Sequence, residues 1–434
     1  MSRRWTPTRV RALIRHTGPT SLLFRRRLAL MGGAVIVGLA ALVFAHVADL
    51  AGHAFRRMID VWPYAPLLLT PLGFALIVWI TRQYAPAAAG SGIPQVIAAT
   101  KGKGGVVSRL VDMPTAALKC VLTTAALLIG ASVGREGPTV QISAALLGWT
   151  HRILQVPMRV SVMIAGGAAG VAAAFNTPLA GITFAIEELA AAYEQRMTLL
   201  VIATVIISGM VTLGLAGNYV YFGGGVEARL GVASAIPVAL AGGFLGGISG
   251  GFFARWTLAA ARTSHRFLEV RKRYPVAFAG LCGLAVAVIG VATGLTWGTG
   301  YAPARQLIMG GELPQWFAPA KFAATLATTV SGIPGGIFAP SLATGAGFGH
   351  LLRFIFPGEP ASAIVLMGMA AYFTGVVRAP LTAVIIITET TGTRGFMLPL
   401  LGAALIADAS AQLVCKERLY HGLAKGFLDR HPAQ

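Results

Sequence analysis

The chain has 434 residues, of which 56% are hydrophobic and only 12% are charged, and its mean hydropathy is +0.72. Soluble domains carry about 25% charged residues, so this composition predicts a polytopic protein in a lipid bilayer. The formal charge of +20 does not indicate nucleic-acid binding, because a nucleic-acid footprint needs a soluble basic domain. Basic residues at the chain ends and in short connections instead fit loops beside anionic lipid on the cytoplasmic face.

The three cysteines, Cys120, Cys282 and Cys415, are far apart and show no C-x-x-C spacing. This pattern favours neither a disulfide framework nor a zinc site. We interpret them as packing residues and expect no metal and no cofactor.

The N-terminal 27 residues contain eight arginines with apolar residues between them, which predicts a short interfacial helix on the cytoplasmic face. The following apolar run, 28–51, is interrupted only by His46 and Asp49. It is too long for the apolar part of a signal peptide and predicts a first spanning helix. The N-terminus is then expected in the cytoplasm and the protein in the inner (plasma) membrane.

A second span is predicted at 67–80 and leads into Gly90-Ser91-Gly92-Ile93-Pro94. A proline at the first helical position loses no hydrogen bond, because the N–H it lacks would be unpaired there. The stretch therefore predicts a backbone break followed by a helix. Ser91 either caps that helix or donates its hydroxyl to an anion, and the pentapeptide alone leaves both open.

The same logic at Gly134-Arg135-Glu136-Gly137-Pro138 predicts a helix that begins at Pro138. Its free N–H groups and positive dipole end form a site for an anion, and Glu136 can itself be that anion. A charged residue at bilayer depth costs about 2.5 to 3.5 kcal/mol on insertion scales, so it lines a pathway or has a partner. The alternative is a structural ion pair with Arg135.

Several apolar segments of the first half are shorter than the 17 or so residues needed to cross a bilayer about 30 Å thick. Short helices interrupted by glycine or proline predict broken helices that meet near the membrane midplane. The last of them ends in Ile186-Glu187-Glu188, and a long span precedes a glycine-rich midpoint at 218–229. The predicted segments are 115–133, 138–149, 160–175, 178–193 and 197–218.

The second half repeats this outline. A long helix from Ile236 carries two rows of glycines at four-residue spacing, which favour close helix contact. The third backbone break, at 332–340, has the same place within the second half that the break at 134–138 has within the first. Halves at about 28–218 and 232–420 thus predict an all-α inverted repeat with its site at their interface. The further segments are 275–293, 318–330, 340–355, 362–376, 380–390 and 396–413, followed by a polar tail with Tyr420. Glu389 and Asp408 are interpreted as structural or interfacial.

The ordered set Gly90–Pro94, Gly134–Pro138 and Gly336-Ile337-Phe338-Ala339-Pro340 resembles the anion-selectivity signatures of the CLC family of chloride channels and proton-coupled chloride exchangers. The resemblance implies a CLC-type inverted repeat of many tilted and broken helices in a homodimer. Each subunit would have its own chloride pathway. The transport domain would occupy 28–434, without the cytoplasmic domain that some members append.

The resemblance also implies residue roles. Glu136 is expected to be the external gating and proton-binding glutamate. Chloride is expected to bind the hydroxyls of Ser91 and Tyr420 and the backbone N–H groups of Ile337 and Phe338. The remaining signature positions are Gly90, Gly92, Pro94, Gly134, Arg135, Gly137, Pro138, Gly336 and Pro340.

Glu188 bears on the choice between exchanger and channel. Exchangers similar to this chain commonly carry a glutamate there as the internal proton relay, whereas the channels carry an apolar residue. Glu187 resembles a second exchanger acid that supports Glu188. A chloride–proton antiporter is therefore expected, although two solvated acids at a helix end and a passive channel gated by voltage or pH stay open. Gln95 departs from the family pattern, in which glutamate commonly follows the first motif.

Two matches to G-x-S-x-G, around Ser132 and Ser249, leave an intramembrane serine hydrolase as a remote alternative. A hydrolase needs a histidine base beside the serine. The eight histidines lie mostly in loops or near helix ends, so we expect a transporter and not an enzyme.

Overall fold

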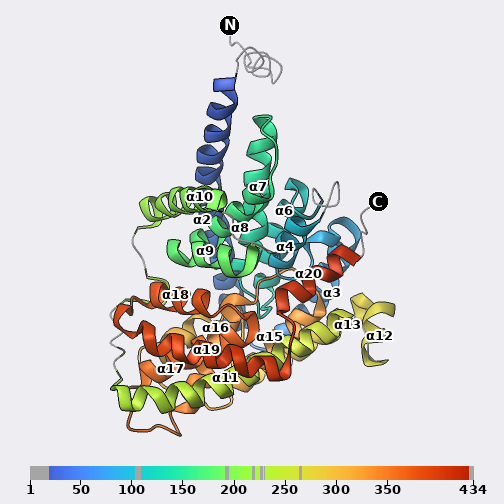
Figure 1. Cartoon of the computed structure of the whole chain (residues 1–434). Helices are drawn as coiled ribbons and strands as arrows, with labels where there is room; N and C mark the ends of the chain where they lie inside the picture. Colours follow the sequence, from blue (N-terminus) through green and yellow to red (C-terminus); the bar gives the residue numbers. More distant parts are fainter. Residues whose placement is uncertain are drawn as a thin grey trace.

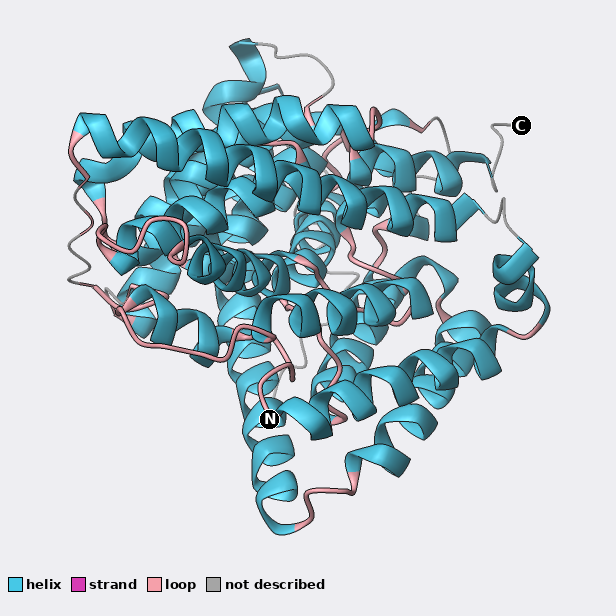
Figure 2. Cartoon of the chain, turned by 90° about the horizontal axis from the view of Figure 1, so that it is seen from below, coloured by secondary structure: helices cyan, strands magenta, loops and turns pink. Residues whose placement is uncertain are grey.

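The computed structural model describes residues 19–102, 109–190, 195–217, 220–224, 228, 230–262 and 266–429. Within these residues the chain is helical, with one isolated antiparallel bridge between Gly134 and Gly336 (Figures 1 and 2). In the first half the helices are α2 (Pro19–Val61), α3 (Pro66–Tyr84), η1 (Pro86–Ala88), α4 (Ile93–Lys101), α6 (Met113–Leu128), α7 (Glu136–Ile153), α8 (Val160–Phe175), α9 (Pro178–Phe184), the π-helical turn η2 (Ala185–Leu189) and α10 (Gln195–Ala216). In the second half they are α11 (Val232–Arg262), α12 (Arg266–Arg273), α13 (Pro275–Thr293), α14 (Tyr301–Ile308), α15 (Phe317–Ser331), α16 (Phe338–Leu352), α17 (Ala361–Val377), α18 (Pro380–Thr391), η3 (Arg394–Phe396), α19 (Met397–Val414) and α20 (Leu419–Asp429).

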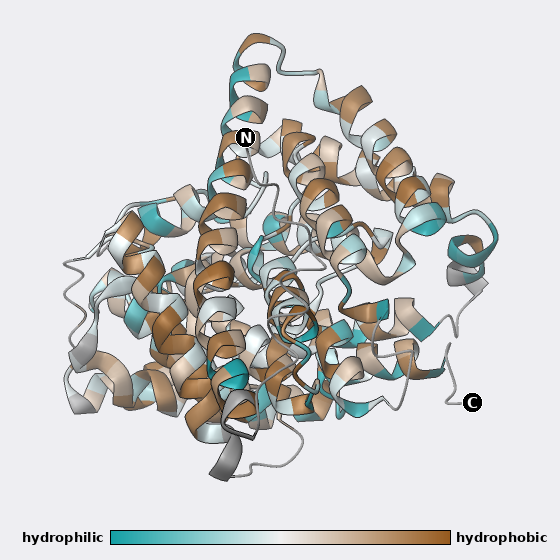
Figure 3. Cartoon of the chain, turned by 90° about the horizontal axis from the view of Figure 1, so that it is seen from above, coloured by the Kyte–Doolittle hydropathy of each residue, from teal (hydrophilic) through white to brown (hydrophobic). Residues whose placement is uncertain are grey.

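Six of the described helices are long and apolar enough to cross a membrane, namely α2, α3, α10, α11, α13 and α19. Hydrophobic residues run along the bodies of the long helices (Figure 3). The shorter apolar helices α6, α8, α17 and α18 lie between them, as expected for interrupted helices in a multi-pass membrane protein.

Helix α2 is longer than the predicted span at 28–51. It begins at Pro19 and takes in Arg25–Arg27, and it continues through Arg56 and Arg57 to Val61. Most of the predicted interfacial helix, residues 1–18, lies outside the described residues. The predicted spans at 67–80 and 275–293 are confirmed by α3 and α13.

The helix starts at the two later glycine–proline motifs were predicted two residues too late. Helix α7 begins at Glu136 and α16 at Phe338, so Pro138 and Pro340 are each the third helical residue. The first four N–H groups of a helix have no partner within it, so proline is tolerated there beyond the first position. At the chain end, the predicted polar tail is the amphipathic helix α20, and Tyr420 within it is fully buried.

The helices of the two halves correspond one to one from α6 onward. Helices α7 and α16 begin at Glu136 and Phe338, α9 and α18 at Pro178 and Pro380, and α10 and α19 at Gln195 and Met397, a constant separation of 202 residues. The two halves form an upper and a lower layer in Figure 1, and α20 returns to pack on α4. This arrangement is the predicted inverted repeat.

The two glycine rows of α11 face two different helices. A Cβ at Gly246 or Gly250 would lie within 2.7 Å of Ala371 or Tyr372 on α17, whereas one at Gly243 or Gly247 would lie within 2.8 Å of α19. Both rows therefore permit the close helix contact that the sequence predicted.

Two glutamates fasten the halves together reciprocally. Glu187 of the first half accepts hydrogen bonds from the first-turn N–H groups of α18 at 3.1 and 2.7 Å. Glu389, 202 residues later, accepts from those of α9 at 3.3 and 2.8 Å. Each carboxylate satisfies free N–H groups and the positive dipole end of a helix in the other half. Asp408 pairs with Arg378 at 2.5 Å, so the contacts of Glu389 and Asp408 agree with a structural interpretation.

Because the Glu389 carboxylate caps α9, we expect its removal to lower the stability of the protein measurably. Replacing Glu389 with alanine leaves two N–H groups of α9 unpaired, and we expect it to cost about 1 to 2 kcal/mol of stability. The apparent Tm of the purified protein in detergent checks this. Glu312→Ala is the control, because the Glu312 side chain is 82% exposed and its ion pair with Arg353 spans 3.7 Å. An equal shift in both variants would contradict the capping role.

Candidate anion site

The three glycine-containing breaks converge on one another. The N–H of Gly134 donates to the carbonyl of Gly336 at 2.8 Å, and the N–H of Gly336 donates back at 2.7 Å. The N–H of Gly335 donates to the carbonyl of Gly90 at 3.1 Å. Segments far apart in the sequence are thereby fixed side by side, with the starts of α7 and α16 meeting at this point.

Glycine is required at these positions for space as well as conformation. A Cβ at Gly137 would lie 2.4 Å from the Ser91 hydroxyl, and one at Gly336 would lie 2.9 Å from the nitrogen of Gly137. Gly90 and Gly92 have φ of +69° and +108°, which strongly favours glycine. Side chains at Gly137 and Gly336 would fill the space between Ser91 and the starts of α7 and α16.

The Glu136 side chain lies at the start of α16. The side chain is fully buried, and Oε2 accepts a hydrogen bond from the N–H of Ala339, in the first turn of α16, at 3.4 Å. Oε1 has no hydrogen-bond partner. The predicted alternative, an ion pair with Arg135, is wrong as the principal contact, because Arg135 pairs with Asp49 at 2.7 Å and donates to the carbonyl of Ala45 at 2.6 Å.

Ser91 does not cap α4. The residue before this helix is Gly92, whose N–H donates to the side-chain oxygen of Gln95 at 3.1 Å. The side-chain amide of Gln95 also donates to the carbonyls of Ala87 and Ala89 at 3.0 and 2.6 Å, which an ionised glutamate cannot do. The departure at Gln95 thus supports the loop that carries Ser91.

Two buried hydroxyls remain available to a ligand. The oxygens of Ser91 and Tyr420 are buried and form no hydrogen bond of standard geometry, although the two hydroxyls interact with each other. Both residues and Ile337 line a cavity of about 940 Å³. Its wall also carries the acidic Asp429 and five basic side chains, of which Arg262 and Lys425 are paired with Glu417. The remaining basic side chains, Arg82, Arg271 and Lys272, leave an excess of positive charge that favours an anion inside.

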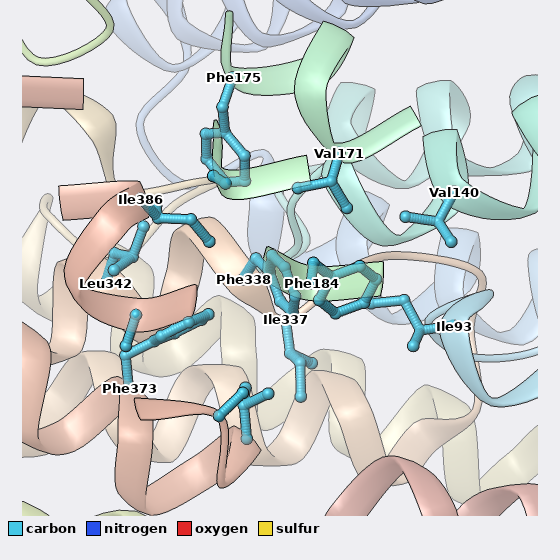
Figure 4. Close-up of a cluster of buried hydrophobic side chains, with 14 of the residues drawn as sticks. Ile93, Val140, Val171, Phe175, Phe184, Ile337, Phe338, Leu342, Phe373 and Ile386 are labelled. Atoms are coloured by element: carbon cyan, nitrogen blue, oxygen red, sulfur yellow. The ribbon is translucent and has the colours of Figure 1, made fainter. Parts of the chain in front are cut away.

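The Phe338 side chain points into an apolar cluster (Figure 4). Its ring lies 5.7 Å from that of Phe184 and 5.0 Å from that of Phe373, measured between centroids in edge-to-face geometry. The Tyr420 ring lies 5.9 Å away. The N–H groups of Phe338, the first residue of α16, and of Ile337, which precedes it, have no carbonyl of their own helix to bond.

Glu188 lies on the π-helical turn η2, a local irregularity that often occurs at functional sites. Its side chain is fully buried, Oε1 lies 3.1 Å from Nδ1 of His421, and Oε2 has no partner. The neighbouring Glu187 is turned the other way, onto α18. The alternative that Glu187 and Glu188 are merely solvated at a helix end is therefore wrong.

Two buried lysines were missed by the sequence analysis. Lys119 donates to the carbonyls of Ala88 and Gly90 at 2.7 and 2.5 Å. Lys321 donates to the hydroxyl of Ser132 at 2.9 Å and to two further carbonyls. They precede Gly134 and Gly336 by the same fifteen residues, and this equal spacing was the signal that could have identified them.

The serines of the two G-x-S-x-G matches have structural partners. Ser132 contacts Lys321 and Thr325, and Ser249 donates to the carbonyl of Leu245 in its own helix. Neither serine has a histidine partner in the described part of the chain. No group of three or more metal-ligating side chains occurs among those residues either.

Comparison with known proteins identifies the family. Residues 73–412 match the family model for voltage-gated chloride channels. A crystal structure of a slow cyanobacterial Cl⁻/H⁺ antiporter matches with a TM-score of 0.81 at 23% identity, covering 94% of this chain and 99% of that one. A CLC-type fluoride/proton antiporter gives 0.76 at 20% identity over 94% and 99%, and a eukaryotic CLC transporter 0.74 at 21% over 93% and 75%. The chain belongs to the voltage-gated chloride channel family, the CLC family.

Proposed function

We propose that this protein is a secondary active antiporter that exchanges chloride for protons across the membrane. One observation carries the proposal: the buried carboxylate of Glu136 occupies the N-terminus of α16, where a halide ion would also bind. Two negative charges cannot share that position at low cost. Chloride can replace the carboxylate once Glu136 takes up a proton, so anion movement requires a proton.

The surrounding residues supply the anion pathway in this proposal. Chloride enters from the basic cavity and binds the hydroxyls of Ser91 and Tyr420 together with the backbone N–H groups of Ile337 and Phe338. Hydroxyl and N–H donors suit an anion because both stabilise negative charge without carrying a formal charge that would hold it too tightly. Protonation of Glu136 then lets chloride enter the position at the start of α16 that the carboxylate occupied.

Glu188 serves as the internal proton relay, and Glu187 supports it. The rings of Phe184 and Phe338 pack edge to face. Phe184 directly precedes η2, which carries Glu188, and Phe338 begins α16, whose first turn contacts Glu136. The proton route and the anion route are therefore expected to diverge at Glu136.

A passive chloride channel gated by voltage or pH is the second candidate. The presence of Glu188 favours exchange, and two of the similar solved structures are described as proton antiporters for chloride and for fluoride. A serine hydrolase remains a remote alternative.

The proposal extends to assembly and location. The protein would be a homodimer in the inner membrane, with a cytoplasmic N-terminus. A basic segment, 1–27, would precede a transport domain, 28–434, built from halves at about 28–218 and 232–420. It would need no cofactor and would bind chloride as its substrate.

Reconstitution into vesicles tests the central claim. With an imposed chloride gradient and equal pH on both sides at the start, coupled exchange should move protons and build up a pH difference across the vesicle membrane. Chloride flux without any coupled proton movement, at every pH tried, would make the channel the correct description.

The two acids should give different variant phenotypes. Glu136→Gln removes the charge that competes with chloride, so we expect chloride flux to persist while proton coupling and pH dependence are both lost. Glu188→Gln should lose proton movement but keep chloride flux that depends on external pH, because Glu136 still titrates. Chloride efflux from vesicles across a range of external pH measures the contrast. Identical pH profiles for the two variants would argue against separate roles.

The close packing at Gly137 provides a steric test. Gly137→Ala would place a methyl group 2.4 Å from the Ser91 hydroxyl and fill the space proposed for chloride, so transport should fall at least about tenfold. Gly148→Ala on the same helix is the matched control, because its Cβ meets only the flexible end of Met158 at 2.7 Å. Chloride efflux and chloride binding by calorimetry measure both variants. Retained binding in Gly137→Ala would place the anion elsewhere.

A further inference from the structure

Helix α20 presents two consecutive residues to two different surroundings. Tyr420 lines the basic cavity, whereas His421 contacts Glu188 and does not belong to the cavity lining among the described residues. Consecutive residues of an α-helix point about 100° apart. The side chains of Tyr420 and His421 therefore diverge by about that angle, one toward the cavity and the other onto Glu188.

His421 connects a buried carboxylate to solvent. The side chain of Glu188 is 0% exposed, whereas that of His421 is 24% exposed, and their atoms Oε1 and Nδ1 are 3.1 Å apart. A fully buried acid cannot exchange protons with water directly, so it needs a group that reaches both. Histidine is suited to this task because its charge changes between about pH 5 and 8.

The other charged groups near this contact are engaged elsewhere. Arg418 donates to the backbone carbonyl of Glu187 at 3.1 Å, and the Glu187 carboxylate is held by α18. Glu417 is paired with Lys425 of α20 and with Arg262 of α11. In the described part of the chain, His421 is therefore the titratable side chain bonded to the Glu188 carboxylate.

We infer that His421 delivers protons between the cytoplasmic solution and Glu188. The inference rests on the proposed exchange. In the inward-to-outward step, the imidazolium gives its Nδ1 proton to Oε1 of Glu188, which leaves a neutral imidazole and a neutral carboxylic acid. Hydronium or a buffer acid of the cytoplasmic solution then reprotonates the ring. The reverse sequence returns a proton from Glu188 to the cytoplasm by the same atoms.

The position of His421 also explains why the proton route avoids the anion cavity. Basic side chains outnumber acidic ones on the cavity wall, and an excess of positive charge raises local chloride concentration while it disfavours hydronium. His421 does not line that cavity among the described residues, so a relay there gives protons a path outside it. Tyr420 and His421 then divide the two substrates between adjacent positions of one helix.

The experiment compares wild-type protein with His421→Gln and His421→Ala in vesicles. Glutamine retains hydrogen bonding but does not titrate, so the ratio of proton flux to chloride flux should fall about tenfold in both variants, less than the full effect of a positioned proton-transfer group because water can replace it in part. The dependence of proton flux on internal pH should flatten. Imidazole buffer inside the vesicles should restore proton flux in His421→Ala but leave His421→Gln unchanged. His53→Gln, at an exposed histidine of α2 that contacts Arg56, should behave as wild type.

The outcomes separate this inference from the proposed function. Coupled wild-type transport with an unchanged flux ratio in His421→Gln would overturn the role of His421 alone. A lower ratio that neither changes the internal pH profile nor responds to imidazole would also overturn it, because His421 would then only hold Glu188 in place. Wild-type chloride flux without protons would overturn the exchanger and His421 with it.

Discussion

The contact between the starts of α7 and α16 is the constraint on which the rest of the structure depends. Gly134 and Gly336 exchange both backbone hydrogen bonds, and this brings two positive helix ends and their unpaired N–H groups together. The Glu136 side chain lies beside these ends and accepts a hydrogen bond from the N–H of Ala339. The cost of burying its carboxylate is offset by the same N–H groups that would otherwise be left unpaired.

Two buried lysines hold the loops around this contact. Lys119 and Lys321 each donate to carbonyl oxygens of the loops beside the site, and both are fully buried. A buried amine without acceptors would be strongly unfavourable, so these carbonyls and lysines stabilise each other. The carbonyl oxygens of both loops are thereby turned toward the lysine side chains.

Local chemistry made much of the fold and the central motifs predictable. Glycine and proline mark backbone breaks through their own conformational limits, so the three motifs and most helices could be located from the sequence. The start of α7 was misplaced because proline fits anywhere in a first turn. Contacts between distant residues left no local signal: Asp49 is 86 residues from Arg135, and His421 is 233 from Glu188. Helix α20 was taken for a polar tail because its apolar face is short and its outer face is polar.

The repeat is symmetric in its backbone but not in its titratable groups. The position 202 residues after Glu136 is Phe338, and the position 202 after Glu188 is Thr390, whose hydroxyl bonds the carbonyl of Ile386 in its own helix. By contrast, Glu187 has an acidic counterpart in Glu389, and both cap helices. The structural acid is thus present in both halves, whereas the acids proposed to carry protons occur in one. An aromatic ring at Phe338 closes one side of the site with apolar packing, and a single carboxylate remains to compete with the anion. In the proposed exchange, two equivalent helix starts with one carboxylate between them would let a single protonation event decide whether the anion can pass.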